Sequence, residues 1–372
     1  MIRRALVVGG GIAGMATAIM LRRNGVPVDL IDLDPEWRVY GAGITITGPT
    51  LRAFQALGIL ERVIAGAHTA DGVQVCDVAG EPLTIIPTPP PAGSDVPGSG
   101  GIMRPALHKI LSNDVLALGA NVRLGITVDA IASAADAEHV RFSDGTSGDY
   151  DLVVGADGLF SRVRALLFPN APAPQFTGQA CWRLMTGRLP AIDRRHYFLG
   201  GPVKAGLTPV SSSEMYMFVL ENVGANAWVD PATFHEKLRD LLVAFGGPLA
   251  RVRAGLNPES SIVYRPLETV LLPAPWHVGR TVIVGDAAHA TTPQLASGAG
   301  MAVEDGLVLA DEMQRASSVE EGLRRFMSRR YARCRLVVEN SLQLGRYEVD
   351  RAPLEAQTSL VALSLERLAE AI

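Results

Sequence analysis

Three glycines near the start of the chain have the spacing of a phosphate-binding turn. Gly9, Gly11 and Gly14 follow a short apolar run and precede a stretch that can form a helix. In this spacing the first glycine makes a tight turn, the second lets a pyrophosphate approach the backbone, and the third lets the helix pack closely on the strand. The free N–H groups and the dipole at the helix N-terminus then favour the negative charge of the phosphates. The turn therefore predicts a binding site for a dinucleotide.

An acidic residue stands where such a site needs one. Asp32 lies 18 residues beyond Gly14, at the end of an expected strand over residues 28–31. Before that strand, residues 12–23 are expected to form a helix that stops at residues 24–25, Asn-Gly, because both tolerate a left-handed conformation. Asp32 can then hold the two hydroxyls of an adenosine ribose. The motif does not distinguish FAD from NAD, since both carry an ADP half, and a purely structural glycine turn is the alternative.

Two further turns have similar surroundings farther along the chain. Asp157 with Gly158 and Gly285 with Asp286 each follow a short apolar run that is typical of a buried strand. Each pair also precedes a stretch that can form a helix. In this order and spacing, the three turns indicate that separate segments of one domain return to a single dinucleotide site.

The composition excludes several classes of partner. The chain has 38 acidic and 34 basic residues, and its net charge of −4 argues against binding to nucleic acid or to an anionic membrane. No uninterrupted apolar run reaches about 18 residues, and residues 1–5 run directly into the first strand without a signal peptide. We therefore expect a cytoplasmic protein without an integral membrane segment. The cysteines are far apart and lack matching histidines, so no metal centre is expected.

The elements that must position these turns divide into a mixed region, a mainly β region and a helical end. The length of 372 residues favours two domains. Residues 72–86 and 178–264 have β-like patterns, interrupted by an expected helix over residues 234–245. The proline- and glycine-rich residues 87–101 predict an exposed loop between domains. Further helices are expected over residues 104–118, 301–313, 319–345 and 354–372.

Taken together, these segments resemble the single-component FAD-dependent aromatic hydroxylases, the p-hydroxybenzoate hydroxylase class of flavoprotein monooxygenases. The matching segments are residues 7–14, 40–47 with 51–58, 104–107, 151–162, and 285–289 through 304–305. The resemblance implies an α/β fold: a Rossmann-like doubly wound FAD-binding domain with an inserted β-rich substrate domain and C-terminal helices. The implied domains are residues 1–70, 101–177 and 270–345 for FAD, residues 71–100 and 178–269 for substrate, and residues 346–372 for a C-terminal helix.

The same resemblance assigns roles in holding FAD. A residue in the position of Arg104 contacts the FAD phosphate region, Asp157 and Gly158 lie near the pyrophosphate, and Asp286 holds a ribityl hydroxyl. Glycines at the start of the helix near residue 298 leave the backbone bare, so that its N-terminus can stabilise negative charge on reduced flavin. The complete set of expected cofactor-binding residues is Gly9, Gly11, Ile12, Ala13, Gly14, Asp32, Gly43, Ile44, Arg104, Asp157, Gly158, Asp286, Pro293, Gly298, Gly300 and Met301.

A looser similarity concerns the substrate. Residues 178–184 and 204–216 are most similar to hydroxylases of small heteroaromatic rings, such as alkyl-quinolone and urate hydroxylases. This similarity implies a flat, nitrogen-containing or phenolic substrate. The substrate-facing candidates are Lys204, Tyr216 and Thr47, and the alternatives are an exposed lysine at a strand end, a core aromatic residue and a threonine outside the pocket.

The expected function is hydroxylation of an aromatic or N-heteroaromatic ring with NAD(P)H and O2 through a flavin C4a-hydroperoxide. Only one complete nucleotide fingerprint is present, so NADH or NADPH is expected to bind transiently as a co-substrate. One alternative is a flavin-dependent dehydrogenase, reductase or epoxidase on the same fold. Another is a non-catalytic FAD-binding redox sensor. The protein is expected to be a monomer or a homodimer.

Three other features predict structure more than chemistry. His289 follows the Gly285–Asp286 turn, but in the resembling family this histidine is usually structural. The arginines between Arg324 and Arg335 are spaced among apolar residues at helical intervals, which indicates a solvated helix face. The final helix has one apolar stripe and no row of cations on its polar side, so docking within the chain is favoured over contact with a membrane, a lid role or a partner subunit.

Overall fold

The computed structural model describes residues 2–39, 41–91, 93–134, 136–225 and 228–372. Tyr40, at the start of one matching segment, and Ala92, in the proline-rich stretch, lie outside the described residues, as does Met1. Within the described chain, no helix is both long enough and apolar enough to cross a membrane.

A six-stranded sheet forms the base of the dinucleotide site. Its apolar central strands are buried on both faces, as expected of a parallel sheet covered by helices. Strand β1 (Ala5–Val8) lies between β12 (Leu152–Gly155) and β2 (Val28–Asp32) and pairs with both in parallel. In spatial order the strands are β18 (His277–Val278), β19 (Thr281–Ile283), β12 (Leu152–Gly155), β1 (Ala5–Val8), β2 (Val28–Asp32) and β8 (Asn121–Leu124).

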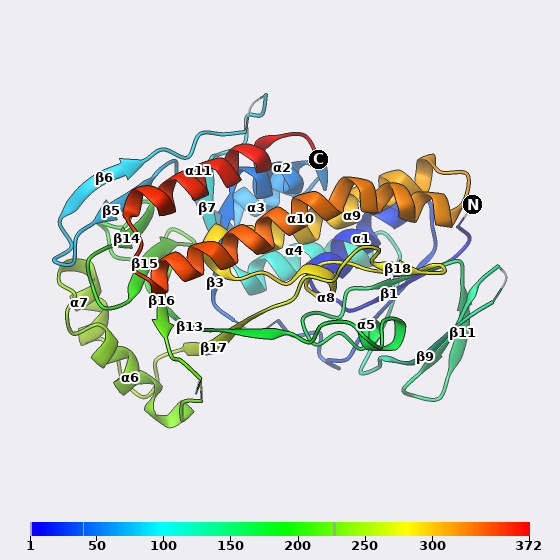
Figure 1. Ribbon diagram of the computed structural model, residues 1–372, viewed down its shortest axis with the longest axis horizontal. Helices are drawn as coiled ribbons and strands as arrows, with labels where there is room; N and C mark the ends of the chain where they lie inside the picture. The colour runs from blue at the N-terminus through cyan, green and yellow to red at the C-terminus, as the bar shows by residue number, and fades with distance from the viewer. Residues whose placement is uncertain (1, 40, 92, 135, 226–227) are drawn as a thin grey trace.

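Helices from distant parts of the chain cover this sheet (Figure 1). Helix α1 packs against α9 so closely that a Cβ atom on Gly306 would lie 2.7 Å from the Thr17 nitrogen. Helix α10 extends beside both halves of the molecule, and α11 packs against it. The helices of this part are α1 (Ile12–Arg23), α2 (Gly48–Ala56), α3 (Leu60–Ala65), α4 (Arg104–Ala117), α5 (Arg162–Leu167), α8 (Asp286–His289), α9 (Gly298–Arg315), α10 (Val319–Val349) and α11 (Leu354–Ala369).

A seven-stranded sheet forms the second half of the molecule. Its middle strands alternate between a face that packs on α6 (Phe234–Leu241) and α7 (Gly247–Ala254) and a face that looks toward the first half. In spatial order the strands are β17 (Ile262–Thr269), β13 (Gln175–Gly187), β16 (Glu214–Asn222), β15 (Lys204–Pro209), β14 (Arg195–Phe198), β5 (Val73–Cys76) and β6 (Pro82–Ile86). Segments around residues 73–86 and 175–269 thus share one sheet, and the domain boundaries stay a prediction.

Two small sheets complete the fold. Strands β9 (Val128–Ser133), β10 (Glu138–Phe142) and β11 (Ser147–Tyr150) form an antiparallel hairpin sheet beside the six-stranded sheet. Strands β3 (Gly43–Thr47), β7 (Ser99–Met103) and β4 (Ala67–Thr69) form the other. Short 3-10 helices cover Pro231–Thr233 and Pro293–Leu295.

The structure corrects three expectations about individual elements. Residues 99–101 do not belong to an exposed loop, because they form the buried start of β7. Their glycines permit this: a Cβ atom on Gly100 or Gly101 would lie 2.7 Å or 2.5 Å from a carbonyl oxygen of a neighbouring segment. The helix expected over residues 234–245 ends earlier, at Leu241 of α6, and a separate helix, α7, follows outside the expected range. The helix expected to end at residue 345 continues to Val349.

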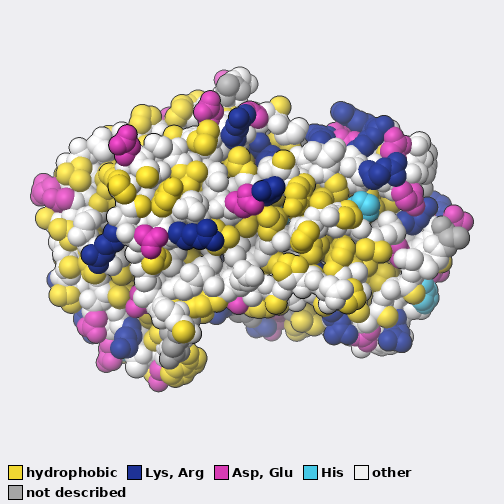
Figure 2. Space-filling model, viewed as in Figure 1, with side chains coloured by type: hydrophobic (Ala, Val, Ile, Leu, Met, Phe, Trp, Pro, Cys, Tyr) yellow, Lys and Arg dark blue, Asp and Glu magenta, His cyan; other side chains and the backbone are white. Residues whose placement is uncertain are grey.

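The arginine-rich helix α10 is not a uniformly solvated face. Arg330 is completely buried, and Arg333 is only partly exposed, whereas Arg324, Arg325 and Arg335 are exposed as expected. Arg330 is buried because two carboxylates of α9 pair with it. Figure 2 shows that charged and hydrophobic side chains are mixed over the face that carries α10 and α11, without one large block of either sign.

Candidate active site

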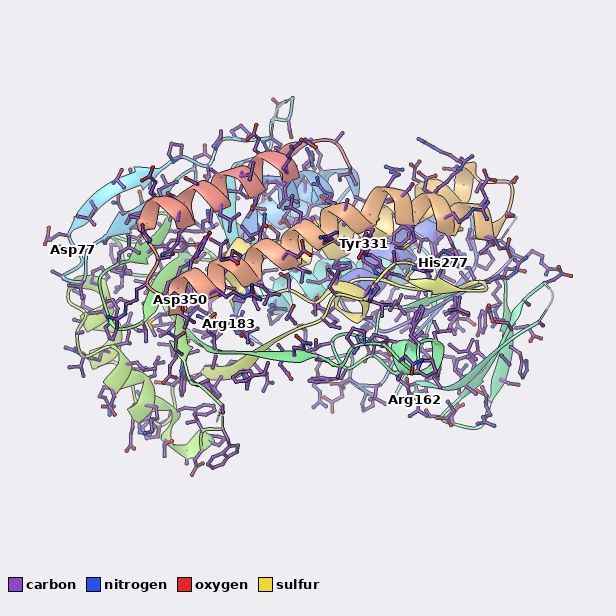
Figure 3. All side chains as sticks on the ribbon, viewed as in Figure 1. Asp77, Arg162, Arg183, His277, Tyr331 and Asp350 are labelled. Carbon is purple, nitrogen blue, oxygen red and sulfur yellow. The ribbon has the colours of Figure 1, made fainter. Side chains whose placement is uncertain are left out.

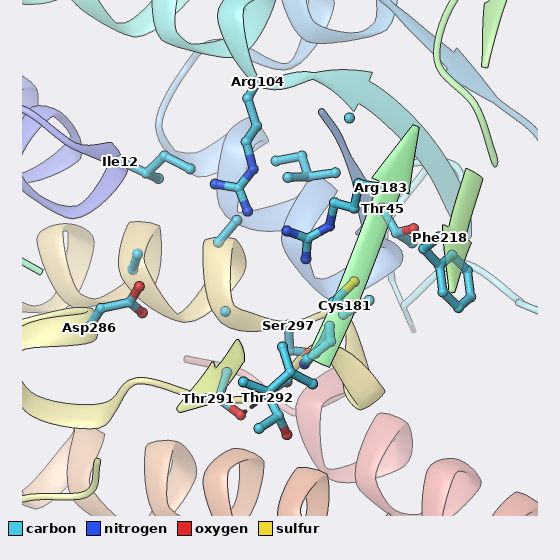
Figure 4. A pocket seen from close by; sticks show the side chains of 18 of the residues that line it. Ile12, Thr45, Arg104, Cys181, Arg183, Phe218, Asp286, Thr291, Thr292 and Ser297 are labelled. Carbon is cyan, nitrogen blue, oxygen red and sulfur yellow. Dashed lines mark hydrogen bonds between the residues drawn. The ribbon is translucent and has the colours of Figure 1, made fainter. Parts of the chain in front are cut away.

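A cavity of about 400 Å³ lies where the two halves of the molecule meet. Segments from the glycine turn, β3, the start of α4, β13, β15, β16 and residues 291–302 line it (Figure 4). The expected site residues that line it are Gly11, Ile12, Ala13, Gly43, Ile44, Arg104, Gly158, Lys204, Tyr216, Asp286, Pro293 and Gly298. Those that do not line it are Gly9, Gly14, Asp32, Thr47, Asp157, Gly300 and Met301.

The glycine turn leaves room for a phosphate at one position and is tightly packed at the others. Gly9 has a φ of 108°, and a Cβ atom on Gly14 would lie 1.8 Å from the Gly9 oxygen. A Cβ atom on Gly11 would meet no atom within 4 Å. No side chain of the described residues caps the N-terminus of α1, whose first turn lines the cavity. This arrangement fits a pyrophosphate group.

Asp32 lies behind the turn and holds it in place. Its Oδ2 accepts a hydrogen bond from the Gly10 nitrogen at 2.6 Å, and its Oδ1 accepts one from the Asp34 nitrogen at 2.8 Å. A carboxylate has about four lone-pair sites, so two ribose hydroxyls can still be accepted. The geometry is therefore compatible with the expected contact to adenosine.

Replacing Asp32 with alanine is expected to weaken FAD binding about tenfold or more, because charge-assisted hydrogen bonds of about 1.5–3 kcal/mol each are lost. Titration of FAD into the apoprotein, followed by flavin fluorescence, measures this effect. Asp34→Ala is the matched control, because Asp34 lies in the same loop and pairs with Arg38 near the surface. An Asp32→Ala protein that binds FAD as tightly as the wild type would remove Asp32 from the cofactor site.

The two residues of the Asp157–Gly158 turn have different roles. Asp157 caps helix α5, since its carboxylate accepts hydrogen bonds from the Arg162 and Val163 nitrogens at 2.7 Å and 3.0 Å. Gly158 faces the cavity, has a φ of 80°, and has open space where a side chain would stand. The glycine is thus available to a ligand, while the aspartate fixes the loop.

The Gly285–Asp286 turn approaches the glycine turn directly. A Cβ atom on Gly285 would lie 2.7 Å from the Ala13 Cβ, so this glycine permits the contact. The next residue, Asp286, lines the cavity. Burial raises the pKa of the Asp286 carboxyl, although His289 and Arg104 act in the opposite direction. An oxygen ligand such as a ribityl hydroxyl would find a hydrogen-bond acceptor here.

The segment after this turn presents a bare helix N-terminus. Helix α9 begins at Gly298, which lines the cavity, and no described side chain caps it. Gly300 and Met301 face elsewhere: a Cβ atom on Gly300 would lie 2.5 Å from the Thr50 Oγ1, and the Met301 oxygen accepts from Arg330 at 3.2 Å. The dipole of α9 therefore directs its positive end toward the cavity through Gly298.

Two guanidinium groups point into the same cavity. Arg104 comes from the first turn of α4 and Arg183 from β13, and their side chains approach one another in Figure 4. Burial lowers the pKa of the Arg104 guanidinium, and the positive charge of Arg183 lowers it further. Neither arginine makes an ion pair or a hydrogen bond with another described residue. An anionic ligand would offset the repulsion between these two positive charges.

The sequence reasoning overlooked Arg183, although a local signal was present. Residues 180–184 alternate, with Trp182 and Leu184 packed in the core under α6 and α7, while Cys181 and Arg183 line the cavity. An arginine that alternates with buried apolar residues on such a strand is the local signal that identifies Arg183 as a candidate site residue. Figure 3 places Arg183 where β13 passes beside the C-terminal part of α10.

The two substrate-facing candidates on the seven-stranded sheet lie in the cavity with partners. The Tyr216 hydroxyl is 2.6 Å from the Thr45 Oγ1, and Gly43 leaves space for its ring. The Lys204 Nζ donates to the Glu348 Oε1 at 2.6 Å. Burial by itself lowers the pKa of the Lys204 ammonium, but the Glu348 carboxylate outweighs it and the pKa is raised. Lys204 is therefore a charged, ion-paired group on the cavity wall.

Thr47 does not line the cavity, and Thr45 lines it instead. Strand β3 ends at Thr47, whose Oγ1 lies 3.1 Å from the Thr50 Oγ1 in the first turn of α2. Thr50 in turn abuts Gly300. Thr47 thus joins β3 and α2, and Thr45, two residues earlier on the same strand, is the hydroxyl that reaches the ligand space.

Comparison with known families decides which dinucleotide this site serves. The family model described as the FAD binding domain matches residues 3–341. The chain belongs to this family. The predicted resemblance, the α/β fold class and FAD as the cofactor are thereby confirmed.

Relatives of this FAD-binding protein are monooxygenases. It is 32% identical to the 2-heptyl-3-hydroxy-4(1H)-quinolone synthase of Pseudomonas aeruginosa, over 92% of this chain and 88% of the relative. It is 31% identical to the 3-amino-4-hydroxybenzoate 2-monooxygenase of Streptomyces cremeus, over 89% and 84%. The crystal structure of Klebsiella pneumoniae HpxO with FAD and uric acid has the same fold, with a TM-score of 0.85, 23% identity and coverage of 99% and 93%. The expected enzyme class, an FAD-dependent monooxygenase, is confirmed.

Proposed function

We propose that the protein hydroxylates an acidic aromatic or N-heteroaromatic ring with O2 and NADH or NADPH. The observation that carries this proposal is one cavity shared by the FAD-binding turns and by Arg183, Lys204 and Tyr216. Bound FAD supplies the redox and oxygen-transfer chemistry. One atom of O2 enters the ring and the other leaves as water, and NAD(P)H provides the two electrons.

The protein's own residues would orient the ring and exclude water. Tyr216 shares a hydrogen bond with Thr45 and can donate to or accept from a ring oxygen or nitrogen. Burial raises the pKa of the Tyr216 hydroxyl, so it stays protonated at neutral pH. Phe218, Leu220 and Leu267 give the cavity an apolar wall that keeps water from the reacting atoms.

Lys204 would act on the substrate through its ammonium charge. Its Nζ lies 5.5 Å from the centre of the Tyr197 ring, so Tyr197 and Glu348 together fix its direction. A phenolate or ring carbonyl placed in the cavity would find the positive charge of Lys204 already positioned. The ion pair with Glu348 also ties the substrate side to α10.

A substrate screen tests the function directly. FAD-loaded protein is mixed with phenolic and N-heteroaromatic compounds, and the stimulation of NADH or NADPH oxidation is followed. Mass spectrometry of the product under ¹⁸O2 then shows whether one labelled oxygen enters the ring. Turnover without labelled product would favour a dehydrogenase or reductase, and FAD binding without any stimulation would favour a redox sensor.

Replacing Lys204 with methionine is expected to raise the substrate KM about tenfold or to increase peroxide release per NAD(P)H, because one charge-assisted hydrogen bond is lost. Flavin content should stay unchanged. Steady-state kinetics with a peroxide assay measure both effects. Lys237→Met is the control, since Lys237 is exposed on α6. Wild-type KM and coupling in Lys204→Met would place Lys204 outside the substrate site.

A further inference from the structure

A buried carboxylate stands directly behind the Gly285–Asp286 turn. Asp305, on α9, accepts a hydrogen bond from the Gly285 nitrogen at 2.8 Å and lies 2.6 Å from the His289 Nε2. Its other oxygen accepts from the Arg330 Nε at 2.8 Å. Asp305 and Arg330 are fully buried, and His289 is nearly so. One carboxylate therefore holds both ends of the short helix α8 and the arginine of α10.

The charges of this cluster favour a permanent ion pair. Burial by itself raises the pKa of the Asp305 carboxyl, but His289 and Arg330 outweigh it and lower the pKa to about 2. Burial by itself lowers the pKa of the His289 imidazole, but Cys334 and Asp305 outweigh it and hold the pKa well above its ordinary value. The turn is therefore anchored by the Asp305 carboxylate, which the His289 imidazole and the Arg330 guanidinium contact at its two oxygens.

The network continues from Asp305 toward the C-terminus of the chain. The Arg330 Nη1 donates to the Glu304 Oε2 at 2.6 Å. Glu304 also accepts two hydrogen bonds from Arg333, at 2.7 Å and 2.8 Å. Arg333 in turn donates to the Leu368 oxygen of α11 at 2.7 Å. A continuous chain of charged hydrogen bonds thus joins the cofactor turn to the last turn of α11.

A second arginine holds the same end of α11. Arg52, on α2, donates to the Leu368, Ala369 and Glu370 oxygens at 3.0 Å, 2.5 Å and 2.9 Å. Cations near a helix C-terminus satisfy its free carbonyl groups and complement its dipole. This docking agrees with the expectation that the final helix packs within the chain, and it gives that helix a polar as well as an apolar attachment.

A metal site is the competing interpretation of the cluster. His289, Asp305 and Cys334 place possible ligand atoms within 4.8 Å of one another. However, the Arg330 Nε donates to Asp305, and the Arg330 Nη2 lies 3.3 Å from the Cys334 Sγ. A guanidinium therefore occupies the position between two of the three ligands and would repel a cation. The cluster is a hydrogen-bonded network.

We propose that Asp305 is a positioning residue for FAD, and that Arg330, Glu304 and Arg333 couple the Gly285–Asp286 turn to the docked helix α11. Buried ion pairs are often replaceable by apolar residues without loss of stability, so stability alone gives little reason for this arrangement. Holding Gly285 fixes the backbone that presents Asp286 to the cavity. This role in FAD binding does not depend on which substrate is hydroxylated.

Asp305→Asn tests the first part, because it keeps the shape of the side chain and removes its charge. The FAD dissociation constant is expected to rise about tenfold, and the absorption spectrum of the bound flavin is expected to shift. Asp311→Asn is the matched control, since Asp311 lies on the same helix and pairs with Arg315 and Arg329 nearer the surface. The control should bind FAD like the wild type. Titration in the absence of substrate and NAD(P)H keeps this test separate from the hydroxylation itself.

Arg333→Met tests the coupling to α11 and also serves if Asp305→Asn fails to fold, because Arg333 lies at the edge of the network. The FAD affinity of Arg333→Met is expected to fall by about threefold or more. In the double variant with Glu304→Gln, the loss of FAD affinity is expected to be smaller than the sum of the two single losses in free energy, because both changes break the same link. Arg335→Met, on the same helix and exposed, is the control.

The thermal midpoints of apoprotein and holoprotein separate positioning from simple stabilisation. Positioning predicts that FAD raises the melting temperature of Asp305→Asn and Arg333→Met by less than it raises that of the wild type, and that the flavin midpoint potential shifts. Equal destabilisation of apoprotein and holoprotein, with unchanged FAD affinity and potential, would overturn the proposal and leave the network a structural element.

Discussion

Replacing Arg104 with methionine is expected to weaken FAD binding by about a hundredfold or more, because two charge-assisted hydrogen bonds to a phosphate contribute about 1.5–3 kcal/mol each. Arg104 lines the cavity and has no ion-pair partner among the described residues. Burial already lowers its pKa, so its charge is costly until an anion arrives. Methionine keeps most of the length of the side chain and removes its charge.

Titration of the apoprotein with FAD, followed by flavin fluorescence, measures the loss. Arg104→Lys should restore part of the affinity, since a lysine keeps the charge but not the two-pronged geometry. Arg162→Met is the control, because Arg162 starts helix α5 and pairs with Asp129 at the surface. Wild-type affinity in Arg104→Met would mean that the phosphates lie elsewhere and that Arg104 serves another ligand.

The parts of the site that were predictable from the sequence are those with local signals. Helix α1 has the predicted bounds, because the glycine turn before it and the Asn24–Gly25 stop after it each act on neighbouring residues. Asp286 also follows its strand directly, whereas α9 begins at Gly298, three residues before the expected start of that helix. The spacing of residues along the sequence is enough to predict a feature that depends only on contacts between residues close in sequence.

The parts that were missed depend on partners far away in the sequence. Arg330 belongs to a helix with alternating charge, and only the carboxylates of Glu304 and Asp305, on another helix, explain its burial. Lys204 pairs with Glu348, which lies 144 residues later. No local pattern in the sequence signals such a pair, because the energy of a buried charge depends on tertiary neighbours.

The end of strand β3 accounts for the remaining difference. Thr45 and Thr47 stand on the same strand with the same alternation, and the sequence alone favoured Thr47. The strand ends at Thr47, where the chain turns into α2, so the Thr47 hydroxyl reaches Thr50. The Thr45 hydroxyl lies 2.6 Å from the Tyr216 hydroxyl. The end of a strand is set by packing between sheets, which alternation does not reveal.

Arg183 carries the second large expected effect. Replacing it with methionine should raise the KM for substrates that carry a carboxylate by about a hundredfold, because a bidentate contact to the anion is lost. The KM for neutral rings of the same size should change little. FAD affinity should stay unchanged, which distinguishes Arg183 from Arg104. Steady-state kinetics with matched acidic and neutral ring compounds measure the difference, and Arg141→Met, on the exposed face of β10, is the control.

The assignment of Arg183 to the substrate side rests on its strand. Strand β13 pairs with β16, where Met185 lies opposite Tyr216, so Arg183 and Tyr216 belong to one wall of the cavity. Arg104 approaches from α4, on the side of the cofactor turns. With Arg104 neutralised by phosphate, the charge of Arg183 would remain available to the substrate. A fall in FAD affinity for Arg183→Met, with an unchanged preference between acidic and neutral rings, would instead place both guanidinium groups on the cofactor.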